Sequence, residues 1–153
     1  MELYSANLYL SMCSWFLDQD LDGFANFFRI QAQEENMHAM KQFDFIHSVD
    51  GKINMLRIDA PENSFESITQ VFEKTLEHEK KVTRSISTIL ETALEDKDYA
   101  THSFFQWFIN EQVEEESTMK NILKKVLMIG ENSSSLYLLN AELLQRIFSP
   151  KDK

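Results

Sequence analysis

The chain has 153 residues with three glycines, two prolines and one cysteine, and this length and scarcity of helix breakers favour one all-α domain with long helices. Its 25 acidic and 15 basic residues give a formal net charge of −10, which argues against nucleic acid as a partner. No apolar run reaches the roughly 18 residues that span a bilayer, no signal peptide is visible, and a lone Cys13 cannot form an internal disulfide, so we expect a cytoplasmic protein.

Five helices are expected from the apolar periodicity and the breaks between them. They cover residues 1–18, 24–50, 66–94, 98–129 and 133–148. Ser64 is the expected N-cap of the third helix, and Gly51 and Gly130 end the second and fourth.

The connection between the second and third helices, residues 51–65, shows no sustained period. At about 3.3 Å per residue its ~15 residues can reach about 50 Å, whereas the second helix is about 40 Å long. The connection can therefore run the whole length of the helices. The other connections are short and join antiparallel neighbours. This pattern predicts a four-helix bundle with one long crossover and a short fifth helix.

Each long helix carries an apolar stripe, which runs from Phe24 through Val49 in the second helix and from Phe104 to Val126 in the fourth. Polar residues interrupt the stripes of the second, third and fourth helices about 11 to 14 residues from the helix start. The interrupting residues are Glu35, His38, Glu79, Gln112 and Glu115, and Glu2 lies on the Tyr9 side of the first helix. In a bundle these residues would lie at one depth. Unpaired carboxylates buried together repel one another, which protonation or a bound cation relieves.

The spacing Glu35-x-x-His38 places a carboxylate and an imidazole on one helix face about 5 Å apart, where they can chelate one ion while Glu35 bridges to a second. Alone this motif is common on protein surfaces. Matched acidic residues on the other helices favour a di-metal centre, and hard oxygens with one imidazole suit iron or manganese. The alternative of isolated salt bridges needs basic partners, but Lys80, Lys81 and Arg84 lie off the Glu79 face.

Four motifs together resemble those of one known family. They are ELYSANLYL at 2–10, AQEExxH at 32–38, EHE at 77–79 and FxxEQVEEE at 108–116. In these motifs the chain resembles the bacterial non-haem ferritins over essentially its whole length. The resemblance implies an all-α, ferritin-like four-helix bundle with one long crossover and a short fifth C-terminal helix. Residues 1–153 would form a single di-iron domain, with 1–130 as the bundle and 133–148 as the fifth helix.

The resemblance also implies roles for individual residues. A first iron site would use Glu2, Glu35 and His38. A second would use Glu35, Glu79 and Glu115, with Gln112 beside them. A third iron site would be lined by Glu34, Glu111 and Glu114. The alternative interpretation of these three residues is a solvated acidic face. Tyr9 would assist oxidation, with an ordinary core tyrosine as the alternative. His78 and His102 are read as surface or packing residues.

A haem-binding relative is disfavoured by the same comparison. In the bacterioferritins the Glu-x-x-His motif occurs twice, the second time on the fourth helix, and a Met directly follows the first Glu. Here the fourth helix has Gln112-x-x-Glu115 instead, and Asn36 follows Glu35. Iron without haem is therefore expected.

The implied function is iron storage with ferroxidase activity, using Fe(II) with O2 or H2O2, in a shell of 24 identical subunits. The fifth helix is amphipathic, and one four-helix bundle cannot bury the whole apolar side of this helix. An interface with another subunit would bury the rest, which favours an oligomer. The apolar residues of the fifth helix are Leu136, Leu138, Leu139, Leu143, Leu144 and Ile147. The alternatives are a di-iron oxidase or peroxidase without storage, which would hold only two irons per subunit, and a structural bundle whose polar layer sets register.

Glu2 lies at the very start of the first helix, where a ligand frays and holds metal poorly. The second helix continues about 15 residues past Glu35, or about 22 Å. We therefore expect a further helical segment of about 10 to 15 residues before Glu2, without which Phe45, Ile46 and Val49 lack a packing partner.

Overall fold

The computed structural model describes residues 1–130 and 132–149, and it divides the chain into two compact units. The first unit contains Met1–Phe65 and Asn132–Lys153, and the second contains Glu66–Glu131. Within the described residues every regular element is an α-helix. The expectation that the whole chain is a single domain stays a prediction.

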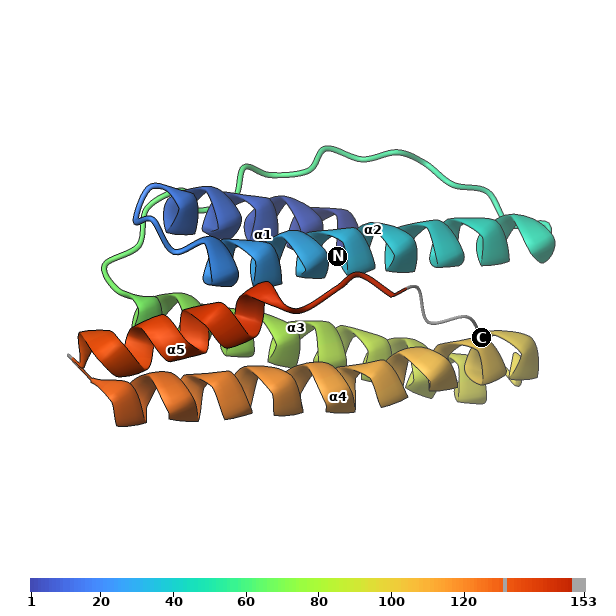
Figure 1. Cartoon of the computed structure of the whole chain (residues 1–153). Coiled ribbons are helices and arrows are strands. Elements are labelled where there is room, and N and C mark those ends of the chain that lie inside the picture. The colour runs from blue at the N-terminus through green and yellow to red at the C-terminus, as the bar shows by residue number, and fades with distance from the viewer. Residues whose placement is uncertain (131, 150–153) are drawn as a thin grey trace. The chain divides into compact units, whose positions relative to one another are not determined.

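The first unit is built on an antiparallel pair of helices, α1 (Glu2–Leu17) and α2 (Asp22–Ser48), joined by a tight turn (Figure 1). Asp20 has a left-handed φ of 57° in that turn, and the backbone N–H of Leu21 donates to the carbonyl of Phe16 at 3.0 Å. Phe16 stacks on the rings of Phe24 and Phe28 at centroid distances of 5.1 and 5.5 Å. This aromatic stack fixes the closed end of the hairpin, because large buried rings contribute most to core packing.

After α2 the chain returns along the hairpin in extended form (Figure 1). The Ser11 hydroxyl of α1 donates to the carbonyl of Glu62, and Trp15 makes an edge-to-face contact with Phe65 at 5.9 Å. These contacts hold the end of the segment against α1. The predicted long, irregular connection between the second and third helices is therefore present.

Helix α5 (Ser133–Leu144) packs on the start of α2. The side-chain oxygen of Asn140 accepts hydrogen bonds from the backbone N–H groups of Gly23 (2.9 Å) and Phe24 (3.2 Å). A Cβ atom on Gly23 would lie only 1.7 Å from the carbonyl oxygen of Asn140, so the close approach of the two helices requires glycine at this position.

The fifth helix ends at Leu144, four residues before the predicted end at 148. The Asn26 amide of α2 donates to the carbonyls of Leu143 (3.2 Å) and Arg146 (3.0 Å), so these groups do not need a further helical turn. Because this cap comes from another helix, the local sequence did not reveal it.

The second unit is an antiparallel pair of longer helices, α3 (Ile68–Glu95) and α4 (Tyr99–Ile129). The N-cap of α3 is Ser67, whose hydroxyl accepts from the backbone N–H of Gln70 at 3.1 Å; the prediction of Ser64 was wrong by three residues. Asp98 caps α4 through the N–H of Thr101 at 3.0 Å. Gly130 ends α4 with a positive φ of 54°, as predicted.

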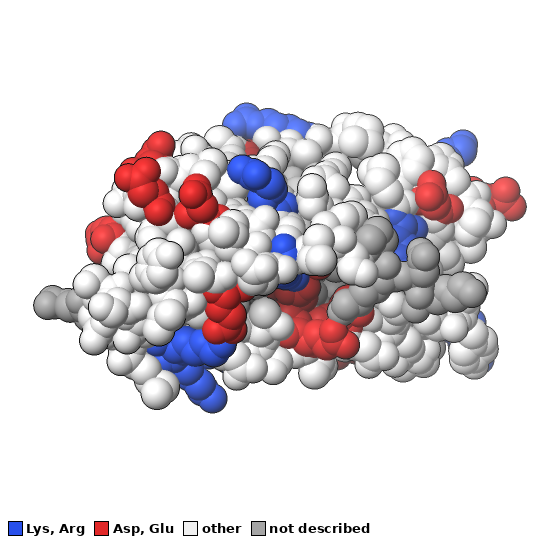
Figure 2. Space-filling view, viewed as in Figure 1, with Lys and Arg blue, Asp and Glu red and all other residues white. Residues whose placement is uncertain are grey.

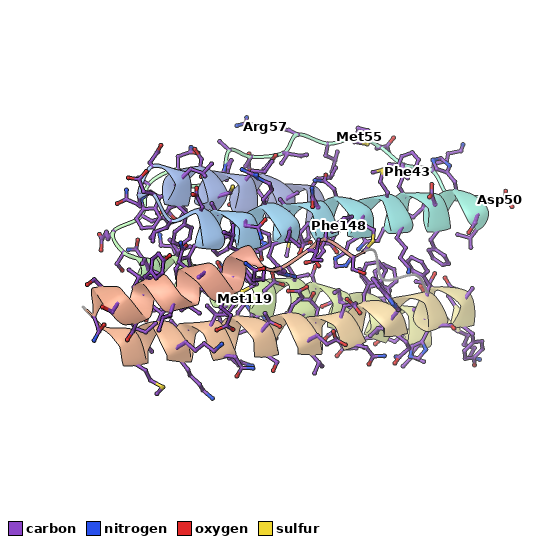
Figure 3. The ribbon with its side chains drawn as sticks, viewed as in Figure 1. Phe43, Asp50, Met55, Arg57, Met119 and Phe148 are labelled. Atoms are coloured by element: carbon purple, nitrogen blue, oxygen red, sulfur yellow. The ribbon has the colours of Figure 1, made fainter. Side chains whose placement is uncertain are left out.

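The predicted stripes are buried along most of their length, including the polar residues that interrupt them. In the second half of α2, by contrast, Val49 at the end of the stripe is exposed, as are Phe43 and Ile46 beside it. A groove of about 570 Å³ lies here, between the start of α1, this half of α2 and the extended segment. In Figure 3, Phe43 lies on the side of α2 that faces this segment, where Met55 is labelled.

Over residues 1–130 and 132–149, no helix combines the length and apolar character needed to cross a bilayer. On the face in Figure 2, acidic and basic side chains are interspersed among uncharged ones, without a continuous field of Lys and Arg.

Candidate metal centre

Glu35 and His38 lie one turn apart on α2, and both side chains are almost completely buried. Glu35 Oε2 and His38 Nδ1 are 3.7 Å apart, which is too long for a direct hydrogen bond. The two groups therefore lie side by side on one helix face, as their spacing predicted, and an ion bound to one would be within reach of the other.

Glu2, on α1, is the third predicted metal ligand of the first unit. Its side chain is 5% exposed, and its Oε1 accepts a hydrogen bond of 2.6 Å from the amide of Gln42 on α2. Its Oε2 is buried and has no hydrogen-bond partner, and it is the only such side-chain atom among the described residues. Since an unsatisfied buried carboxylate oxygen is costly, this atom fits a position that a cation occupies.

Gln42 holds Glu2 in place, and the sequence analysis gave it no role. It follows His38 by four residues and belongs to the same interrupted stripe. That spacing was the available signal, because residues four apart on a helix share a face. The partner on another helix could not be identified from the spacing alone.

Tyr9 is fully buried on α1, and its ring centroid lies 5.9 Å from that of Phe28 on α2. Phe28 precedes Glu35 by two turns on the buried side of α2. This packing is equally that of a core tyrosine, so the role of Tyr9 in oxidation stays a prediction.

In the second unit Glu79 of α3 is completely buried and is paired with Gln112 of α4. The Gln112 Nε2 group donates to Glu79 Oε2 at 2.9 Å and to the Glu79 carbonyl at 3.2 Å. These two bonds orient the amide, since its nitrogen must face Glu79 and its oxygen must then point to the other side. Gln112 thus fixes the position of a predicted ligand.

A hydrogen-bonded chain continues from this pair toward the surface of the second unit. The Thr83 hydroxyl lies 2.9 Å from Glu116 Oε1 and 3.0 Å from the Glu79 carbonyl, so its one proton can be donated to either. Lys120 donates to Glu116 Oε2 at 2.9 Å. This hydrogen bond, more than that from Thr83, lowers the pKa of the Glu116 carboxyl despite its partial burial. The sequence analysis gave no role to Thr83, Glu116 or Lys120.

The remaining predicted ligands of the second unit lie on α4 in two environments. Glu111 and Glu115 are buried and one helical turn apart, whereas Glu114 is exposed. The structure therefore places Glu111 with the buried face and leaves Glu114 in contact with solvent. Glu34, the third-site residue of the first unit, is paired with Arg146, whose Nη2 lies 2.7 Å from Glu34 Oε2.

His78 directly precedes Glu79 in the sequence, and its side chain is buried, which fits the packing role predicted for it. Burial lowers the pKa of its imidazole from 6.5 to about 4, with a smaller contribution from the Lys81 ammonium. The ring is therefore neutral at pH 7. His102 is half-buried, and its ring lies 3.4 Å from the amide of Gln106.

Within the two described ranges, no three His, Cys, Asp or Glu side chains gather closely enough to form a complete metal site. The predicted ligands instead occur as pairs within each unit, Glu35 with His38 and Glu79 with Gln112. The combination of all the predicted ligands in one centre therefore stays a prediction.

Comparison with known proteins supplies evidence independent of this geometry. Residues 1–129 match the family model described as the ferritin-like domain. A bacterial non-heme ferritin from Campylobacter jejuni is 44% identical over 137 residues, which cover 90% of this chain and 82% of that protein. A bacterial non-heme ferritin from Staphylococcus aureus is 39% identical over 147 residues, covering 96% of this chain and 89% of the relative.

Solved structures of Archaeoglobus fulgidus ferritin are also similar. One, a closed form engineered by site-directed mutagenesis, has a TM-score of 0.95 at 44% identity, covering 97% of this chain and 90% of its own. Another, described as a novel open pore ferritin, has a TM-score of 0.95 and covers 95% and 90% of the two chains. These similarities confirm the predicted all-α fold class, with four long helices and a short fifth one.

Proposed function

The chain belongs to the ferritin-like family, and on this basis we propose that it stores iron and oxidises Fe(II) at a di-iron centre. The observation that carries the proposal is the buried, unpartnered Oε2 of Glu2 in the same unit as the buried Glu35 and His38 pair. A carboxylate oxygen held in this state gains most from a cation, and carboxylates with one imidazole are suitable ligands for iron.

In this proposal Fe(II) is the substrate. Glu2, Glu35 and His38 bind the first ion, while Glu35, Glu79 and Glu115 bind the second, with Gln112 orienting Glu79. The negative carboxylates stabilise Fe(III) more than Fe(II), which favours oxidation. Each Fe(II) gives up one electron, and O2 takes up two electrons and two protons to form hydrogen peroxide. H2O2 is the alternative oxidant, and it yields water.

Tyr9 is the proposed auxiliary residue, as a buried phenol on α1. Glu34, Glu111 and Glu114 are proposed to line a third iron site, through which ferric product leaves. No haem is part of the proposal.

Storage requires an assembly, and we propose a shell of 24 copies in the cytoplasm. Support comes from α5 and the residues after it, where Leu138, Leu144 and Ile147 are exposed while Leu139 and Leu143 are buried. Exposed apolar side chains gathered on one short segment are typical of a surface that another subunit covers.

The proposal is tested with Glu35→Ala. Because Glu35 serves both ions, we expect this variant to lose the fast phase of Fe(II) oxidation in stopped-flow measurements and to bind less Fe(II) anaerobically. The fold should survive, since the change removes a buried carboxylate that repels its neighbours. Glu91→Ala, an exposed acid on α3, is the matched control and should behave as the native protein. A normal initial rate in Glu35→Ala would refute the assignment.

The iron content of the aerobically loaded protein tests storage separately. Far more than two irons per subunit supports storage, whereas two per subunit would instead indicate an oxidase or peroxidase that uses the same ligands. A chain that binds no Fe(II) anaerobically would have a purely structural polar layer.

A further inference from the structure

Arg146 lies just after α5, in the segment that runs along α2, on which Phe148 is labelled in Figure 3. Its Nη2 donates to Glu34 Oε2 at 2.7 Å and its Nη1 donates to Gln31 Oε1. Its guanidinium carbon also lies 4.6 Å from the centre of the Phe27 ring. Three side chains from successive turns of α2 therefore hold one guanidinium.

The backbone around Arg146 is fixed as well. The Asn26 amide donates to the Arg146 carbonyl, and Asn140 accepts from the backbone at Gly23 and Phe24. The side chains of Arg146 and Glu34 are 27% and 15% exposed. An ion pair that is partly buried and held at both ends keeps its geometry better than one between two flexible surface side chains.

Glu34 precedes Glu35 directly and was assigned to the third iron site. The oxygen that Arg146 contacts is one of the two with which Glu34 could bind a metal ion. Arginine carries a positive charge in proteins, so the Arg146 guanidinium places a cation beside this carboxylate. Iron that binds through Glu34 Oε2 therefore competes with the guanidinium for this oxygen.

We propose that Arg146 is a built-in competitor of iron for Glu34 and thereby sets the affinity of the third site. This inference rests on the proposed function. Competition weakens binding there, so that iron occupies Glu34 transiently and passes on to storage. When iron leaves, the guanidinium returns to Glu34, because Gln31 and Phe27 keep it within reach.

The alternative role for the same contacts is purely structural: Arg146 clamps the C-terminal segment to α2 and does not affect metal binding. The two roles predict opposite results for metal binding. A clamp that is removed leaves the affinity of Glu34 unchanged or lowers it through disorder, whereas a competitor that is removed raises it.

The test is an anaerobic calorimetric titration of the native protein and of Arg146→Gln with Fe(II). We expect the weakest class of bound Fe(II) to bind about three- to tenfold more tightly in Arg146→Gln, with the two tighter classes unchanged. Arg146→Lys keeps a cation near Glu34 and should stay close to the native affinity. Arg29→Gln removes the same charge from an exposed position on α2 and is the matched control.

The double variant with Glu34→Gln completes the cycle. In a Glu34→Gln background, Arg146→Gln should have no further effect on Fe(II) affinity, because the contested oxygen is gone. Thermal melting of the iron-free proteins reports any loss of the clamp independently. Slower oxidation over many turnovers in Arg146→Gln, with a normal first turnover, is also expected, since iron is retained at the third site.

An unchanged or weaker third class in Arg146→Gln would overturn the inference, as would a third class that Glu34→Gln does not affect. These results are distinct from failure of the proposed function, in which the two tighter classes are themselves missing from the native protein.

Discussion

Two buried carboxylates of the chain, Glu2 in the first unit and Glu79 in the second, are held differently. Glu2 accepts one hydrogen bond from Gln42, and its other oxygen has no hydrogen-bond partner among the residues that the structure describes. Glu79 is bonded to Gln112, and the chain of hydrogen bonds continues through Thr83 to Glu116 and, at the surface, Lys120. The second carboxylate is thus part of a network, whereas the first depends on a single amide.

This difference bears on how each unit would respond to a cation. A carboxylate whose partners are already in place is preorganised, and little of its binding energy is spent on ordering it. An unpartnered oxygen gains more from the first ion that reaches it, but its position is less constrained. We expect the position of Glu2 to depend mainly on Gln42, and the position of Glu79 to depend on several residues.

The largest expected effect is that of Glu79→Ala. It removes a proposed iron ligand together with the acceptor that orients Gln112, so we expect the initial rate of Fe(II) oxidation to fall about 100-fold or more. Stopped-flow absorbance after mixing with Fe(II) in air measures the rate. Glu77→Ala changes an exposed acid on the same helix, paired only at the surface with Lys81, and should leave the rate unchanged. Equal rates in the two variants would exclude Glu79 from the centre.

Acid should weaken the second unit through His78. Its pKa is about 4 in the folded protein but 6.5 when unfolded, so the unfolded state binds more protons between these values and stability falls as the pH falls from 6.5 to 4. The difference corresponds to about 3 kcal/mol. Denaturation of the iron-free protein at several pH values should therefore show a shallower slope in this window for His78→Gln than for the native chain.

Carboxylates also titrate in this window, so the comparison between variants is essential. His102→Gln, which changes a half-buried histidine on α4, should keep the native slope. Hydrogen exchange of α3 and α4 should accelerate in acid in the native protein and less so in His78→Gln. A slope that does not change would mean that His78 is accessible to protons in the folded state.

The first unit should be most sensitive to Gln42→Leu. The substitution keeps the approximate size of the side chain but removes the amide group that donates a hydrogen bond to Glu2. We expect one class of Fe(II) to bind about tenfold more weakly in anaerobic titration, as for other residues that orient a metal ligand. Gln33→Leu, at an exposed position on α2, should have no effect. Unchanged affinity would show that Glu2 is positioned without Gln42.

Much of this fold followed from residue patterns along single helices. The stripe from Phe24 to His38 predicted the buried face of α2, and the stripe on α4 predicted burial from Phe105 to Val126. Gly130 was predicted because a helix end with positive φ favours glycine. The paired spacing of Glu35 and His38 likewise appears as predicted. The stripes and the Glu35–His38 spacing follow the helical period, and Gly130 is a signal within a few residues of one helix end, so all of these features are visible in a single sequence.

Features that depend on another helix were missed. Gln42 with Glu2, Thr83 with Glu116 and Arg146 with Glu34 each join residues at least 33 positions apart, and no local spacing indicates such a pair. The end of α5 was misplaced for the same reason, since its cap is Asn26 of α2. The end of the α2 stripe shows the opposite case: the apolar period continues through Val49, but that side chain is exposed in the structure.

The smallest expected effect, and the sharpest test of the contrast between units, is that of Thr83→Val. Valine has almost the same shape, so only the hydroxyl that links Glu116 with the Glu79 carbonyl is lost. Because Gln112 still donates to Glu79, we expect only about a threefold loss of Fe(II) affinity, and a slight rise in the Glu116 pKa toward its usual value. Titration of Fe(II) measures the first and carboxylate NMR the second. The matched control is Thr88→Val, because the Thr88 hydroxyl donates to the Arg84 carbonyl within the same helix on an exposed face. A loss as large as that of Gln42→Leu would show that Glu79 depends on one contact just as Glu2 does, and the proposed difference between the units would be wrong.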